Sequence, residues 1–96
     1  MYDVSALKDR LDQLIQDDQP ALWELSRYLH ENPELYLQER KACAALTQYL
    51  TRRGLSPQTG TGGLETAFLA ECCPTGIRAP VIDILAEYDA LPIGHA

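Results

Sequence analysis

A short apolar run near the end of the chain, residues 80–87, constrains the fold more than any other part of the sequence. The run is rich in β-branched residues, has the length of a buried strand and begins with a proline, so it predicts a core strand over about 81–87. Polar residues lie at its end or after it, namely Glu87, Asp89 and His95. In α/β proteins such residues emerge at the carboxyl edge of the sheet, where ligands and catalytic groups gather. The sequence therefore predicts a functional site after this strand.

Helical periodicity occupies the first third of the chain. Leucines and an isoleucine recur at helical spacing behind two candidate N-caps, Asp3 and Ser5, and predict an amphipathic helix over about 4–17. Pro20 suits the first turn of a helix, so a second helix is expected from there to about residue 31. The Asn-Pro pair that follows is expected to end it.

A third helix and a glycine-rich turn come before the apolar run. The helix is expected over about 38–53, with Gly54 as its left-handed stop. Residues 56–63 are too rich in turn residues for a regular element and are expected to lead into a hairpin. Strands are then expected at about 65–71 and at the apolar run.

Helices followed by neighbouring strands give an α/β fold class, with three helices and then two or three strands. The 96 residues are enough for one small domain, and no internal repeat divides them. So few strands would leave a sheet edge and an apolar face exposed. We therefore expect a tendency of the chain to self-associate.

Charge and composition exclude several classes of partner. A net charge of −6, from 14 acidic and 8 basic residues, argues against nucleic acid and anionic lipid as partners. No apolar stretch approaches the roughly 20 residues that span a bilayer. The first residues lack the basic and then apolar opening of a secretory signal, and three cysteines show no disulfide-framework spacing. A cytoplasmic protein with no nucleic-acid partner and no membrane partner is expected.

Two small motifs have alternative interpretations. Cys72 and Cys73 are either a redox pair or two incidental thiols at a strand end, and a bridge between adjacent cysteines would be strained. Cys43 lies within a helical pattern and is expected to be a small buried residue. Residues 60–63 look like a phosphate loop but lack its Lys-Ser/Thr ending and preceding strand, which favours a hairpin.

The chain holds few of the donors that a metal site needs. A catalytic zinc takes about three protein ligands, and the two histidines, His30 and His95, lie far apart in sequence. No Cys-x-x-Cys, His-Glu-x-x-His or His-x-Asp spacing occurs. His30 is expected at a helix end, whereas His95 belongs either to a frayed terminus or to the wall of a site. We expect no metal bound to this chain alone.

The residues after the apolar run also carry a resemblance. Three segments occur in the order, and at about the spacing, of the motifs of one enzyme family. They are His30-Glu31-Asn32-Pro33-Glu34-Leu35 with Glu39 downstream, Gly63-Leu64-Glu65-Thr66-Ala67-Phe68, and Glu87-Tyr88-Asp89-Ala90-Leu91-Pro92 with Gly94-His95-Ala96. The chain resembles metallopeptidase family twenty, the zinc-dependent aminoacylases, glutamate carboxypeptidases and amidohydrolases. It is most similar to the p-aminobenzoyl-glutamate hydrolases and related dipeptidases of that family.

The resemblance implies a fold, an activity and one site residue. The fold would be the N-terminal part of a phosphorylase/hydrolase-like zinc-exopeptidase catalytic domain, with residues 1–96 a partial domain that stops before the Cys-Gly-His ligands of the family. The longer protein would cleave amide bonds of N-acyl amino acids or dipeptides, using zinc or manganese and a glutamate base. Asp89 matches the aspartate that orients a ligand near the metal. Pro92 is followed directly by Ile93, where the subgroup has a glycine between them.

Two functional interpretations therefore remain open at the level of sequence. The chain is either the N-terminal portion of a metal-dependent amidohydrolase or exopeptidase, inactive by itself, or a truncated, non-enzymatic small protein or interaction module that keeps the early fold.

Overall fold

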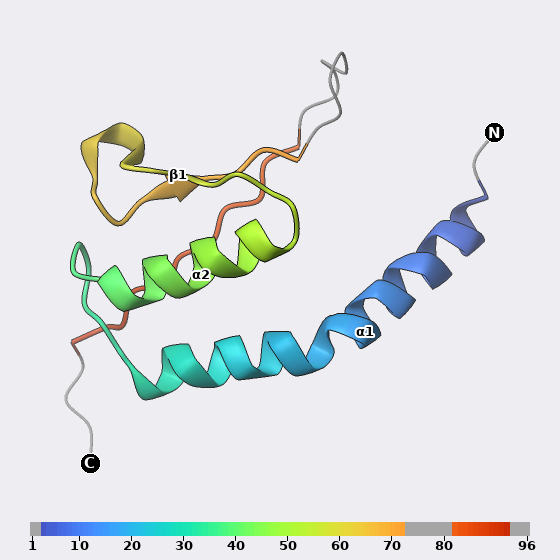
Figure 1. The fold of residues 1–96 in the computed structure, drawn as a ribbon, viewed down its shortest axis with the longest axis horizontal. Coiled ribbons are helices and arrows are strands. Elements are labelled where there is room, and N and C mark those ends of the chain that lie inside the picture. Colours follow the sequence, from blue (N-terminus) through green and yellow to red (C-terminus); the bar gives the residue numbers. More distant parts are fainter. Residues whose placement is uncertain (1–2, 73–81, 93–96) are drawn as a thin grey trace. The chain divides into compact units, whose positions relative to one another are not determined.

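The computed structural model describes residues 3–72 and 82–92 of the chain. The contacts divide the chain into two units, residues 1–31 and residues 32–96. The elements are drawn in Figure 1 and follow one another as α1 (Val4–Glu31), α2 (Arg40–Arg52), β1 (Gln58–Thr59), the short 3-10 helix η1 (Thr61–Gly63) and β2 (Phe68–Leu69).

The helix α1 forms the first unit. Asp3 caps it, because its carboxylate Oδ1 accepts the N–H of Ala6 at 3.2 Å, so one of the two candidate caps is confirmed. The helix continues through Pro20, and the expected division into two helices is wrong. Pro20 removes one backbone hydrogen bond, at a cost of about 3 kcal/mol in a helix interior, and Figure 1 shows the axis bending midway along α1. The expected end at Glu31, before the Asn-Pro pair, is confirmed.

Most large apolar side chains of α1 are exposed in the described structure. None of its residues is buried. Its exposed large apolar residues are Val4, Leu7, Leu11, Leu14, Ile15, Leu22, Trp23 and Tyr28. Of the helices in the described ranges, none has both the length and the apolar content to cross a membrane.

The helix α2 ends in the way that Gly54 predicted. Gly54 adopts a left-handed conformation with φ +86°, and its N–H donates to the carbonyl of Thr51 at 3.0 Å. The N–H of Leu55 donates to the carbonyl of Leu50, also at 3.0 Å. These two bonds define a Schellman motif, which satisfies carbonyls that the helix end would leave unpaired.

The glycine-rich stretch forms the turn of a β-hairpin, as the hairpin interpretation predicted. β1 and β2 pair antiparallel, with Gln58 opposite Leu69 and Thr59 opposite Phe68. η1 lies between them, and the N–H of Gly60 donates to the carbonyl of Ala67 at 2.8 Å. The strand expected over 65–71 is thus limited to its two central residues.

The apolar run behaves differently from its prediction. Residues 82–89 contain no strand, and Figure 1 draws this orange-red segment as an extended chain. Its apolar side chains are open to solvent, with Ile82, Ile84 and Leu85 at 83%, 91% and 93% exposure. A strand needs the backbone N–H and carbonyl groups of a neighbour, and residues 82–89 have no such ladder in the described structure. The expected turn over 74–76 lies outside the described residues.

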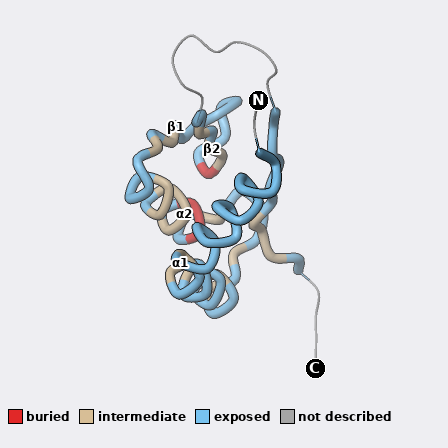
Figure 2. The backbone as a smooth tube through the Cα atoms, turned by 90° about the vertical axis from the view of Figure 1, so that its right-hand side faces the viewer, coloured by how far each residue is buried: buried red, intermediate tan, exposed pale blue. Residues whose placement is uncertain are grey.

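The core of the described structure is small and lies in the second unit. Figure 2 shows buried residues on α2 and next to β2, and these are Ala42, Cys43 and Thr66. The prediction that Cys43 is a small buried residue is confirmed. Cys72 is an exposed free thiol, and Cys73 lies outside the described residues. The broader expectation, an α/β catalytic domain, stays a prediction.

Candidate functional site

The first turn of α2 is capped from a distance by Glu34. Glu39, the residue before the helix, makes no capping hydrogen bond with its side chain. The two carboxylate oxygens of Glu34 instead accept the N–H of Lys41 at 3.0 Å and the N–H of Ala42 at 2.8 Å. A negative charge at the N-terminus of a helix also interacts favourably with the helix dipole. Glu34 is therefore fixed to α2 although it precedes the helix by six residues.

A tight turn brings Glu34 back to the helix. The N–H of Gln38 donates to the carbonyl of Leu35 at 3.0 Å, which closes the turn. Leu37, within it, has φ +63°, the left-handed conformation that a residue with a Cβ adopts at a cost of about 1–2 kcal/mol. The turn thus stores strain so that the Glu34 carboxylate can reach the exposed N–H groups of α2.

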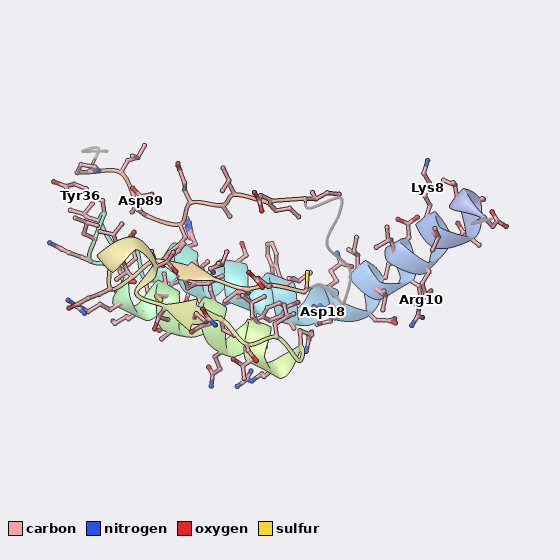
Figure 3. All side chains as sticks on the ribbon, turned by 90° about the horizontal axis from the view of Figure 1, so that it is seen from above. Lys8, Arg10, Asp18, Tyr36 and Asp89 are labelled. Atoms are coloured by element: carbon pink, nitrogen blue, oxygen red, sulfur yellow. The ribbon has the colours of Figure 1, made fainter. Side chains whose placement is uncertain are left out.

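The segment that contains Asp89 is attached to the same region. The backbone N–H of Ala90 donates to the carbonyl of Glu34 at 2.7 Å, and Leu35 and Ala90 form an isolated parallel bridge. Figure 3 shows Asp89 and Tyr36 close to the same end of the second unit, as this bridge requires. The bridge thus places the strand-end motif beside the Pro-Glu-Leu motif, 55 positions away in sequence (90 − 35 = 55).

Tyr88 attaches the segment at a second point. Its phenolic O–H donates to the backbone carbonyl of Thr66, and its ring lies 5.9 Å from the ring of Phe68, at a tilt of 37°. The Oγ1 hydroxyl of Thr66 in turn donates to Glu39 Oε1 at 3.1 Å. Because Thr66 is buried, both of its hydrogen bonds are shielded from competing water. A connected chain of hydrogen bonds therefore runs from Tyr88 through Thr66 to Glu39, the residue before α2.

Tyr88 and Glu34 are in the protonation states that their hydrogen bonds require. Burial raises the pKa of Tyr88 well above its usual value, and the neighbouring Cys43 side chain and the carboxylates of Glu39 and Glu34 raise it further. The phenol therefore stays protonated and remains a donor. For Glu34, desolvation opposes ionisation, but the backbone N–H groups of Ala42 and Lys41 outweigh it and lower the pKa below 4.5. The carboxylate therefore stays ionised at neutral pH.

Asp89 lies between these two attachments. It is half-buried, and its carboxylate forms no hydrogen bond or ion pair with the described part of the chain. Glu87 is exposed, and His30 lies exposed in the last turn of α1, as expected. His95 is outside the described residues. The carboxylate of Asp89 is thus available to accept a hydrogen bond from another group.

The sequence motifs contained several residues whose roles were not predicted. Glu34 and Glu39 were part of the resemblance without an assigned task, and so were Thr66 and Tyr88. The signal was their position: each belongs to one of the three segments that resemble family motifs, and the structure brings residues of all three segments together.

The donors required by a metal do not gather in the described structure. No three side chains of His, Cys, Asp or Glu among residues 3–72 and 82–92 lie close enough together to hold an ion. These residues alone therefore do not fit the zinc or manganese that the resemblance implies.

Two curated proteins similar to this chain are dipeptidases. The chain is 35% identical over 102 residues to a protein of Mus musculus named Xaa-Arg dipeptidase, and 35% identical over 105 residues to the Xaa-Arg dipeptidase of Homo sapiens. Each alignment covers 98% of this chain but 24% of the relative, so the chain spans about a quarter of the length of these curated relatives. No protein-family model and no solved structure matches the chain. The predicted relation to dipeptidases is confirmed at this level.

Proposed function

We propose that the chain is the N-terminal part of the catalytic domain of a metal-dependent dipeptidase or amidohydrolase of metallopeptidase family twenty. The observation that carries this proposal is the 35% identity to Xaa-Arg dipeptidases along 98% of the chain. The contact of all three family-like segments within one unit supports it, because residues that serve one site must meet in space.

The reaction proposed for the complete enzyme is hydrolysis of the amide bond of a dipeptide or an N-acyl amino acid. Dipeptides with a C-terminal arginine are the first substrates to test, because the relatives are named for them. In this proposal Asp89 accepts a hydrogen bond and so orients a neighbouring group, a role that its available carboxylate supports. A divalent metal, zinc or manganese, would be held by residues other than those described.

The experiment begins with the reading frame that contains these 96 residues. The complete open frame is expressed, and the purified protein is assayed with Ala-Arg, with N-acetyl amino acids and with p-aminobenzoyl-glutamate. We expect hydrolysis of at least one of these substrates, with loss of activity on chelation and recovery with zinc or manganese. A folded, metal-supplemented protein that hydrolyses none of them would contradict the proposal. A frame that closes soon after Ala96 would instead favour the non-enzymatic module.

In the active protein, Asp89→Ala tests the assigned residue. We expect turnover to fall by about 10–100-fold, because that is the typical loss when a carboxylate that orients a neighbouring ligand is removed. The urea midpoint should change little, since the side chain holds no partner in the described structure. Unchanged turnover would remove Asp89 from the site.

A further inference from the structure

Asp89 is held on both sides, by bonds of the two residues that flank it. On one side, the Tyr88 phenol donates to the carbonyl of Thr66. On the other, the Ala90 N–H donates to the carbonyl of Glu34 at 2.7 Å. The backbone of Asp89 is thus fixed by the residue before it and the residue after it.

Both attachments lead to the start of α2. Thr66 Oγ1 donates to Glu39, the residue that precedes the helix. The Glu34 carboxylate accepts two N–H groups of the helix itself, at 2.8 and 3.0 Å. A site held by a helix terminus is positioned more accurately than a site on a free loop.

Packing of the residues on either side adds little to this restraint. Upstream, Ile84 and Leu85 are 91% and 93% exposed, and downstream, Leu91 is 68% exposed. Residues with so little covered surface gain little from a fixed position. The two hydrogen-bonded attachments, together with the ring of Tyr88 against Phe68, therefore restrain where the Asp89 carboxylate lies.

We propose that Tyr88 and Thr66 are positioning residues that hold the Asp89 carboxylate in place for catalysis, through their hydrogen bonds to one another and to the start of α2. This inference rests on the proposed function, in which Asp89 orients a group in the active site. Tyr88 and Thr66 act through Asp89 and do not themselves contact the substrate.

The first test removes one oxygen atom. Tyr88→Phe keeps the ring against Phe68 but loses the phenolic donor, and Tyr36→Phe is the matched control, because Tyr36 is exposed near the same segment. In the complete protein, we expect Tyr88→Phe to lower kcat by about 10-fold with KM within about 2-fold of the wild type, since misplaced catalytic groups reduce turnover. Tyr36→Phe should leave both constants unchanged. A wild-type kcat in folded Tyr88→Phe would overturn the proposal.

The second test separates positioning from simple stability. Thr66→Val keeps the shape of the side chain but removes the hydroxyl that donates to Glu39, whereas Thr66→Ser keeps that hydroxyl. We expect Thr66→Val to lower kcat and Thr66→Ser to keep it close to the wild-type value. Serine lacks the methyl group of threonine and therefore leaves the larger packing defect of the two. If kcat instead follows the loss of stability in the two variants, the residues are structural only and the proposal is wrong.

A third measurement does not depend on activity. Hydrogen exchange of the Ala90 amide reports directly on its bond to Glu34, and in the same purified protein Tyr88→Phe should raise the exchange rate by about 10-fold relative to Tyr36→Phe. Unchanged exchange would show that Tyr88 does not restrain the segment. A wild-type protein without hydrolase activity would contradict the proposed function, while this exchange experiment would still decide whether the attachment exists.

Discussion

Glu34 connects the capping of a helix to the placement of the candidate site. Its carboxylate accepts the N–H groups of Lys41 and Ala42, and its carbonyl accepts the N–H of Ala90. Protonation of the carboxylate would weaken the cap, because a neutral acid is a poorer acceptor than an ion and has no charge to interact with the helix dipole. The stability of the second unit is therefore linked to the ionisation of one side chain.

This linkage predicts an acid-dependent loss of stability. The pKa of Glu34 is lowered in the folded state, so the unfolded chain binds the proton more readily. The stabilisation is complete above the usual pKa of 4.5 and is lost as the pH falls below it, through the lower folded-state value. We expect the urea midpoint to fall less steeply between about pH 5 and about pH 3 in Glu34→Gln than in the wild type. The control Glu71→Gln, at an exposed position, should keep the wild-type slope; an equal slope in Glu34→Gln would contradict the prediction.

Leu37 offers a stabilising substitution. Its left-handed conformation costs about 1–2 kcal/mol, and glycine would avoid this cost while adding about 0.5–1 kcal/mol of backbone entropy to the unfolded chain. Leu37 is also largely exposed, so little burial is lost. We expect Leu37→Gly to raise the free energy of unfolding by about 0.5–1 kcal/mol, as measured in urea. Tyr36→Gly relieves no left-handed conformation and should lower the free energy of unfolding. If Leu37→Gly lowers it as well, the turn is not strained.

Residues that act through their immediate neighbours were predictable from sequence, and residues that act over a distance were not. The cap Asp3 and the stop Gly54 could be predicted because their partners lie within four or five positions. The capping by Glu34 depends on the left-handed conformation of Leu37. Glycine or asparagine usually marks such a position in a sequence, and here the residue is leucine. The bond between Tyr88 and Thr66 joins residues 22 positions apart, and no periodicity predicts such a pair.

At the scale of elements, α1 shows how local rules compete. Pro20 was expected to begin a new helix, because proline suits a first turn, yet the structure continues through it. A helix can absorb one proline as a bend when the turns on both sides keep their own hydrogen bonds. Residues 82–89 form no strand in the structure, although their composition predicted one. A strand depends on pairing with a neighbouring strand and not on its own sequence alone.

The bend in α1 predicts the effect of Pro20→Ala. Alanine restores the missing N–H donor and removes the contact of the proline ring with the preceding turn, a change worth up to about 3 kcal/mol within a helix. We expect a more negative ellipticity at 222 nm and a later loss of helix on heating. Gln19→Ala, one position earlier, exchanges one good helix former for another and should change both signals little. A less helical Pro20→Ala would mean that the proline begins a separate helix, as the sequence suggested.

At the scale of the whole molecule, little apolar surface is covered. Three residues of the described structure are buried, while Ile82, Ile84, Leu85 and most large apolar residues of α1 are exposed. Exposed apolar surface of this extent is rare in monomeric proteins and marks surfaces that associate. The relatives are about four times longer than this chain, which is consistent with the proposal that further residues of a complete enzyme would cover these side chains.

This exposure predicts that the 96-residue chain associates as its concentration rises. Each apolar side chain of this size gains about 1.5–3 kcal/mol when it leaves water, so the segment around Ile84 should contribute to contacts between copies. Sedimentation velocity should show an apparent mass that increases with concentration, and Ile84→Lys should reduce that increase. The matched control is Asp83→Asn, which makes the same change of one positive charge unit at the neighbouring exposed position while it leaves Ile84 in place. Wild-type chain that stays monomeric throughout, or equal association of Ile84→Lys and Asp83→Asn, would show that residues 82–85 are not the surface that drives association.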